Sequence, residues 1–138
     1  MLWGANMDSF KVYCLVGLGS ALGGMGRLWV SNAVGRRWGE SFPWGTLLVN
    51  ISGSLLIGLI FAMTGPNGRW VGFSRLTMFL MAGICGGYTT FSAFSLQTLH
   101  LARQGNWGQA GAYILLSLAL CLTAVAAGYF LGLLANRL

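Results

Sequence analysis

The stretch "GICGGYTTFSAFSLQ" at residues 83–97 places the strongest constraint on the fold. It holds three glycines, two threonines and two phenylalanines, and it lies inside an uncharged segment, residues 76–102, of the length needed to cross a bilayer. Glycine and threonine are weak helix formers, yet an unsatisfied backbone group that faces lipid costs several kcal/mol. We therefore predict a membrane helix that is broken near its middle, with the break facing protein, water or an ion.

The composition of the whole chain is that of a membrane protein. Of 138 residues, 56% are hydrophobic and only 7% are charged, whereas a soluble domain carries about 25% charged residues. The uncharged runs predict an all-α membrane protein with a single four-helix transmembrane domain over residues 1–138, whose helices span about 11–34, 44–64, 73–101 and 108–134. The first of these spans the membrane only if Arg27 lies near a membrane face or in a wet cavity.

Basic residues are dispersed at the helix ends, so the net charge of +6 does not indicate a nucleic-acid partner. Four spans divide them almost evenly between the two sides of the membrane: Lys11, Arg69, Arg75 and Arg137 on one, and Arg36, Arg37 and Arg103, with Arg27 leaning that way, on the other. Because the Lys and Arg bias of the loops sets orientation, we expect the chain to insert both ways.

Small residues recur at four-residue spacing, which lets membrane helices approach closely. The pairs are Gly19/Gly23, Ser54/Gly58, Gly83/Gly87 and Gly128/Gly132. Four spans are too few to enclose a wide pathway, so we expect an oligomer in a lipid bilayer. The three cysteines fall in different helices without metal-type spacing, and they are interpreted as packing residues.

Polar side chains repeat along one face of two predicted helices. Thr46, Asn50 and Ser54 are spaced by four residues in the second helix, and Tyr113, Ser117 and Cys121 are spaced likewise in the fourth. These faces are interpreted either as a polar track along a pore or as hydrogen bonds that join helices. Arg27 likewise indicates a water-filled vestibule or an anion route, or a side chain that extends to the interface.

Phe91 and Phe94 follow the predicted break and share one helical face. Such a pair is commonly core packing or lipid contact. The edge of a phenyl ring, however, carries the positive part of its quadrupole. Rings presented edge-on therefore replace water around a small anion without a fixed charge that would trap it.

The sequence resembles the Fluc (CrcB) family of bacterial fluoride channels in three segments. These are "GGYTTFSAFS" at residues 86–95, "GTLLVNISGSLLIG" at residues 45–58 and "GGMGRLWV" at residues 23–30. The resemblance covers all four predicted spans. It implies a passive, fluoride-selective channel of the bacterial inner membrane that relieves fluoride toxicity, built as an antiparallel, dual-topology homodimer with two pores and a structural sodium ion at the dimer interface.

The resemblance also implies roles for individual residues. The fluoride pore would be lined by Phe91, Phe94, Asn50, Thr46, Ser117, Tyr113 and Arg27, and the sodium ion would be bound by the backbone carbonyls of Gly86 and Thr89. Tyr88 and Ala93 occupy variable positions of the motif, and Cys121 stands where a further hydroxyl is expected. Fluoride in particular is implied by the resemblance, since the residue pattern alone does not fix the size of the anion.

Two of these implications agree with the residues themselves. The even Lys and Arg balance is what an antiparallel homodimer requires. Two helix breaks related by a twofold axis would place four carbonyls around one cation, a set of oxygen ligands that suits a hard ion.

Other function classes fit less well. A small multidrug-type exporter also uses four short helices, but it needs a carboxylate inside the membrane, and the only acids are Asp8 and Glu40, outside the predicted spans. An enzyme is disfavoured because the sequence shows no set of catalytic residues: the single histidine, His100, has no acidic or cysteine neighbour in the sequence. A purely structural membrane subunit would leave the break and the polar faces unexplained.

Overall fold

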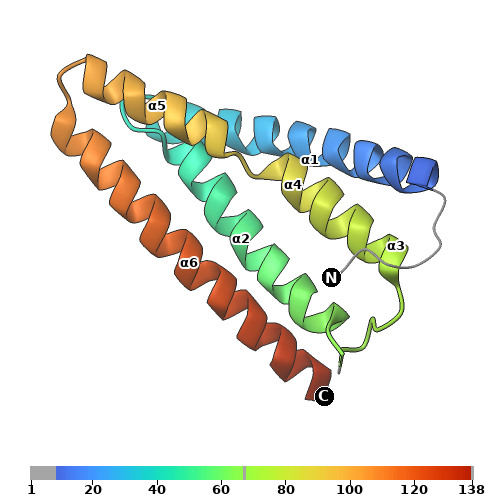
Figure 1. Cartoon of the computed structure of the whole chain (residues 1–138). Helices are drawn as coiled ribbons and strands as arrows, with labels where there is room; N and C mark the ends of the chain where they lie inside the picture. The colour runs from blue at the N-terminus through green and yellow to red at the C-terminus, as the bar shows by residue number, and fades with distance from the viewer. Residues whose placement is uncertain (1–8, 67, 138) are drawn as a thin grey trace.

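The computed structural model describes residues 9–66 and 68–137, and every regular element within them is helical. In chain order the helices are α1 Ser9–Trp38, α2 Trp44–Thr64, α3 Ser74–Thr77, the π-helix η1 Met78–Cys85, α4 Gly86–Tyr88, α5 Phe91–Arg103 and α6 Trp107–Arg137. Helix α2 lies in the centre, with α6 along one side and α1 with η1 along the other (Figure 1).

Close contacts between α1 and the η1–α4 segment depend on glycine. A Cβ atom added to Gly19 would stand 2.7 Å from the carbonyl oxygen of Phe79 and 2.8 Å from Cα of Gly83. One added to Gly87 would stand 2.6 Å from Cα of Ser20. The spacing of these small residues therefore predicted a real interface, in which the two backbones are in direct contact.

Helices α2 and α6 pack in the same way. A Cβ atom on Gly58 would meet the carbonyl oxygen of Val125, and one on Gly128 would meet that of Leu55. Ser54, which the sequence pairs with Gly58, instead lines a cavity beside this interface. The tight α2–α6 pair forms the wall against which the site described below is built.

The third predicted helix is interrupted, but at the threonines and not at the glycines. Residues 78–88 remain helical, first as a π-helix and then as one α-turn. Thr89 (φ −78°, ψ 157°) and Thr90 (φ −152°, ψ 117°) are extended, and α5 begins at Phe91. The glycines were expected to weaken the helix, but it continues through them; Gly83 and Gly87 let it contact α1, as their four-residue spacing predicted.

Three helical segments among the described residues are long and apolar enough to cross a membrane: Trp44–Thr64, Ser74–Arg103 and Trp107–Arg137. Helix α1 has 30 residues, but it is not among them; Arg27 lies within it, and Arg36 and Arg37 lie in its last turn. The chain is therefore a multi-pass membrane protein with an all-helical fold.

Candidate functional site

A cavity of about 300 Å³ lies where the helix break meets α2 and α6. Its walls come from the predicted polar faces of both helices and from the residues around the break. They are Asn50, Gly53, Ser54, Ile57, Thr89, Thr90, Phe91, Phe94, Ser117, Leu118, Cys121 and Leu122. We call it the break cavity. Five of the nine residues predicted for the pore and the sodium site thus lie together: Asn50, Thr89, Phe91, Phe94 and Ser117.

The two phenylalanines differ in their surroundings. The ring centroids of Phe91 and Phe94 are 5.3 Å apart, and their planes meet at 49°. Phe94 is 9% exposed, whereas Phe91 is 75% exposed. Packing within one chain therefore accounts for Phe94. Most of the Phe91 side chain, by contrast, lies on the surface of the chain.

Ser117 supplies a free polar group to the cavity wall. It is 7% exposed, and its Oγ is the one buried side-chain polar atom in residues 9–66 and 68–137 that has no hydrogen-bond partner. A buried hydroxyl that makes no hydrogen bond costs stability unless a ligand or water satisfies it. This hydroxyl is thus the group of the cavity that most needs an additional ligand.

Asn50 joins helix α2 to the break. Its Nδ2 donates to the carbonyl of Thr90 at 3.0 Å, and its Oδ1 accepts from the N–H of Thr90 at 2.8 Å. The side-chain amide therefore pairs with the extended backbone as a neighbouring β-strand would. Because Nδ2 carries two hydrogens, one N–H remains for a ligand in the cavity.

The break also frees the two carbonyls that were predicted to bind sodium. In a continuous α-helix, Gly86 would accept from the N–H of Thr90 and Thr89 from the N–H of Ala93. Here the first N–H is bonded to Asn50, and the second is bonded to Thr90 Oγ1 at 3.2 Å. Gly86 and Thr89 are thus the carbonyls whose helical donors are taken by side chains.

Tyr113 lies beyond the break cavity, in the aromatic core. It is fully buried, with its ring centroid 5.1 Å from that of Phe94 and 5.5 Å from that of Phe42. Its hydroxyl donates to Oε1 of Gln97 at 3.0 Å. Gln97 was not among the predicted residues, although it lies three residues after Phe94 on the same helical face, a spacing that could have indicated it.

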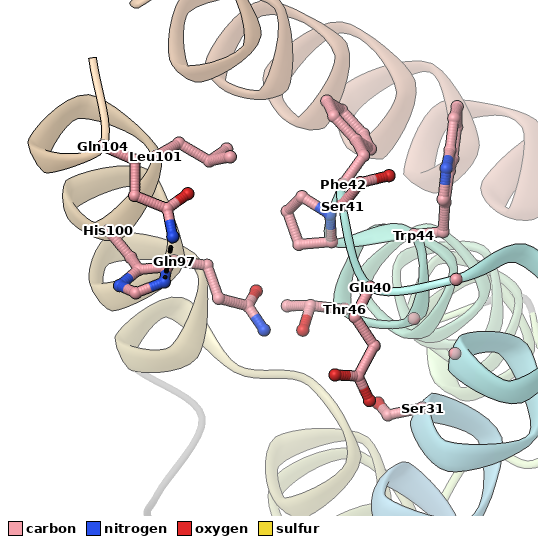
Figure 2. A pocket seen from close by; sticks show the side chains of 14 residues that line it. Ser31, Glu40, Ser41, Phe42, Trp44, Thr46, Gln97, His100, Leu101 and Gln104 are labelled. Atoms are coloured by element: carbon pink, nitrogen blue, oxygen red, sulfur yellow. Dashed lines mark hydrogen bonds between the residues drawn. The ribbon is translucent and has the colours of Figure 1, made fainter. Parts of the chain in front are cut away.

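A second cavity, of about 450 Å³, opens on the other side of Tyr113, and we call it the mouth cavity. Thr46 and Gln97 both line it, and they extend toward each other across it in Figure 2. The predicted polar face of α2 therefore runs from one cavity to the other, with Thr46 in the mouth cavity and Asn50 and Ser54 in the break cavity.

Besides Tyr113, two predicted residues lie outside the cavity walls. Arg27 is half-buried on α1 and lines neither cavity, and Gly86 is exposed beside the break. Within the described chain the structure does not bring Arg27 together with the phenylalanines.

Comparison with known proteins identifies the family of this chain. Residues 14–129 match the family model "CrcB-like protein, Camphor Resistance (CrcB)". A protein of Methylocella silvestris named "Fluoride-specific ion channel FluC" is 48% identical over 91% of this chain and 96% of its own length. One of Opitutus terrae with the same name is 47% identical over 93% of this chain and 97% of its own length. The chain therefore belongs to the CrcB family of membrane channels.

Proposed function

We propose that this chain is a fluoride channel and that fluoride passes through the break cavity and the mouth cavity in turn. The observation that carries the proposal is the Ser117 hydroxyl, buried without a hydrogen-bond partner in the wall that Phe91 and Phe94 share. Relatives named as fluoride-specific channels support the choice of ion.

The chemistry of the break cavity suits a small anion. The Ser117 O–H and the remaining N–H of Asn50 are donors, and the phenyl edges are weakly positive. None of the lining residues is charged. Binding by several weak groups permits the ion to enter and to leave, as conduction requires.

Packed aromatic rings separate the two cavities. Phe94 contacts Tyr113 on the side of the break cavity, and Phe42 contacts it on the side of the mouth cavity. In this proposal the N–H donors of Gln97, whose Oε1 accepts from the Tyr113 hydroxyl, and the Thr46 hydroxyl continue the polar track, so that the ion meets a donor at each stage.

We place α1 in the membrane as a fourth span. Helix α1 packs along η1 and α4, which belong to the membrane-capable segment Ser74–Arg103. A helix of 30 residues is about 45 Å long, which exceeds the hydrocarbon core of about 30 Å. Arg27 then lies where its long side chain reaches the interface or a wet vestibule.

An antiparallel homodimer would cover surfaces that a single chain leaves exposed. Phe91 is 75% exposed, and extended backbone beside it cannot face lipid without large cost. A second copy, inserted in the opposite orientation, would cover both. Each copy would contribute residues to the pathways, which gives the two pores that the family resemblance implies.

The same arrangement fits a sodium ion at the dimer centre. The carbonyls of Gly86 and Thr89 have lost their helical donors, and oxygen atoms of this kind bind hard cations. Two copies related by a twofold axis would supply four such carbonyls. The ion would neutralise the inward-pointing carbonyl dipoles and hold the two breaks together.

The function is that of a channel and not of an enzyme. In the bacterial inner membrane such a channel would release fluoride passively. A proton-coupled drug exporter lacks its carboxylate here, because Glu40, the acid among the described residues, is exposed between α1 and α2.

Ion efflux from liposomes tests the proposal. Purified protein is reconstituted into liposomes that hold fluoride or chloride, and the release of each ion is measured with a selective electrode. Fluoride should leave without added energy while chloride is retained. Equal release of both ions, or fluoride release no faster than from protein-free liposomes, would refute the proposed function.

A further inference from the structure

The mouth cavity differs from the break cavity in its charged groups. It lies at the end of the molecule where α1 and α5 end and α2 begins, and its wall is mostly polar (Figure 2). Two of its lining residues can carry a full charge, Glu40 and His100. Figure 2 shows them on opposite sides, with His100 on α5 and Glu40 in the segment that joins α1 to α2.

The other charged groups near this end lie outside the cavity wall. Arg36 and Arg37 are exposed in the last turn of α1, and Arg103 is exposed in the last turn of α5. Helix α2 contributes no titratable side chain to the wall, and the nearest on α6 is Tyr113, which is buried behind it. Because arginine is always charged, any change in the charge of the mouth depends on Glu40 and His100.

Protonation of His100 would change the donors available in the mouth. Nε2 of His100 lies 2.8 Å from Nε2 of Gln104, so the neutral ring accepts an N–H from the amide. A protonated ring has N–H donors at both nitrogens, so Nε2 no longer accepts from the Gln104 amide. The amide then either turns its Oε1 toward the ring or moves away, and in both cases its N–H donors are released beside a positively charged ring on an exposed wall, where they can bind an anion.

We propose that the mouth cavity is an anion-capture site that works when His100 is protonated, and that Glu40 opposes capture when it is not. This inference rests on the proposed fluoride pathway, which the mouth cavity joins at Thr46 and Gln97. Histidine changes its charge between pH 5 and 8, where fluoride stays mostly ionised. The cavity wall then gains a positive charge opposite Glu40, which raises the local fluoride concentration.

Fluoride efflux at low fluoride concentration measures capture, because entry then limits the rate. We expect the rate for the native chain to rise about threefold or more from pH 7.5 to pH 5.5, below the roughly 10- to 1000-fold of strongly focused clefts. His100→Gln should show no such rise, and Glu40→Gln should be faster than the native chain at pH 7.5. Arg103→Gln, which removes a charge outside the wall, should keep the pH dependence.

Leak of hydrofluoric acid through the lipid is subtracted with protein-free liposomes at each pH. A native rate that does not change with pH would overturn the capture site. So would a His100→Gln variant that keeps the native pH profile while it elutes as the native assembly in gel filtration.

A binding measurement separates this inference from the proposed function. His100 is the single histidine of the sequence, so after removal of any affinity tag the imidazole ¹⁵N signals of labelled protein report it alone. At pH 6, sodium fluoride should shift these signals in a saturable way, and an equal concentration of sodium gluconate should not. A shift without efflux would refute the channel but keep the capture site. The absence of a fluoride-specific shift would overturn the capture site even in a working channel.

Discussion

Asn50 has two roles, one toward the ion and one toward the backbone of the break. The sequence predicts a donor to fluoride, and the structure adds a pair of hydrogen bonds to Thr90, at 3.0 and 2.8 Å. An amide suits both, because it offers two N–H donors and one acceptor. A carboxylate of the same shape would keep the acceptor but lose every donor.

We expect Asn50→Asp to abolish fluoride efflux. The aspartate would turn a lone pair toward the Thr90 carbonyl, and a charge inside the membrane is costly. Asn136 offers a matched control, since it also bridges backbone groups, donating to the Ala62 carbonyl at 3.0 Å and accepting from the Arg69 N–H at 3.2 Å, away from both cavities. Asn136→Asp should lose stability but conduct; native efflux from Asn50→Asp would reduce Asn50 to a packing residue.

Phe91 and Phe94 separate the packing interpretation from the pore interpretation. Isoleucine keeps an apolar side chain and usually costs less than about 1.5 kcal/mol when volume is roughly conserved, but it has no positive ring edge. If the edges stabilise the ion at the barrier by about 2.7 kcal/mol, each Phe→Ile variant slows efflux roughly 100-fold. Phe130→Ile, on the exposed face of α6, is the control. Near-native efflux from both Phe91→Ile and Phe94→Ile would show that these rings do not form the path.

At the scale of the helix, the break is a capped junction and not a loose segment. Thr90 ends the extended pair, and its Oγ1 accepts from the Ala93 N–H, so that it serves as the N-cap of α5. The Ser92 hydroxyl lies 3.1 Å from the same oxygen. The orientation of α5, and with it that of Phe91 and Phe94, therefore depends on this threonine.

Loss of an N-cap costs about 1 kcal/mol, so Thr90→Val should lower the thermal midpoint of the purified protein, whereas Thr90→Ser should keep it. Thr123 provides the matched control, since its Oγ1 serves no cap and donates to the carbonyls of Ala119 and Leu120 on an exposed part of α6. The thermal midpoints of Thr90→Val, Thr90→Ser and Thr123→Val are measured by thermal unfolding, with gel filtration to monitor the loss of folded protein. Equal midpoints for Thr90→Val and Thr123→Val would argue against the cap.

Local sequence patterns predicted the helices, the existence of the break and the polar faces, because each depends on residues close together in the chain. The details of the break did not follow from them. The sequence does not show that Asn50 takes the N–H of Thr90, since these residues are 40 positions apart. Gln97 was missed for the same reason, because its partner Tyr113 lies on another helix. The glycines near the break suggested a weakened helix, whereas in the structure they allow close contact with the neighbouring helix α1.

At the scale of the whole molecule, basic residues stand at both ends. Arg36, Arg37 and Arg103 lie in the last turns of α1 and α5, and Arg137 lies in the last turn of α6, at the opposite end (Figure 1). Since loop charge sets orientation, an almost even distribution allows both insertions. The proposed antiparallel dimer requires that they occur.

Lysines added at one end should therefore remove activity without touching the pathway. Asn106→Lys with Gln109→Lys charges one end at exposed positions outside both cavities, and Val71→Lys with Phe73→Lys charges the other. Each pair alone should force a single orientation and abolish fluoride tolerance in bacteria that lack their own exporter. Co-expression of the two oppositely biased chains should restore tolerance, and so should the quadruple variant, whose balance is even again. Full tolerance from cells that contain only one orientation would rule out the antiparallel dimer, because no oppositely inserted copy would then be present to cover Phe91 and the break.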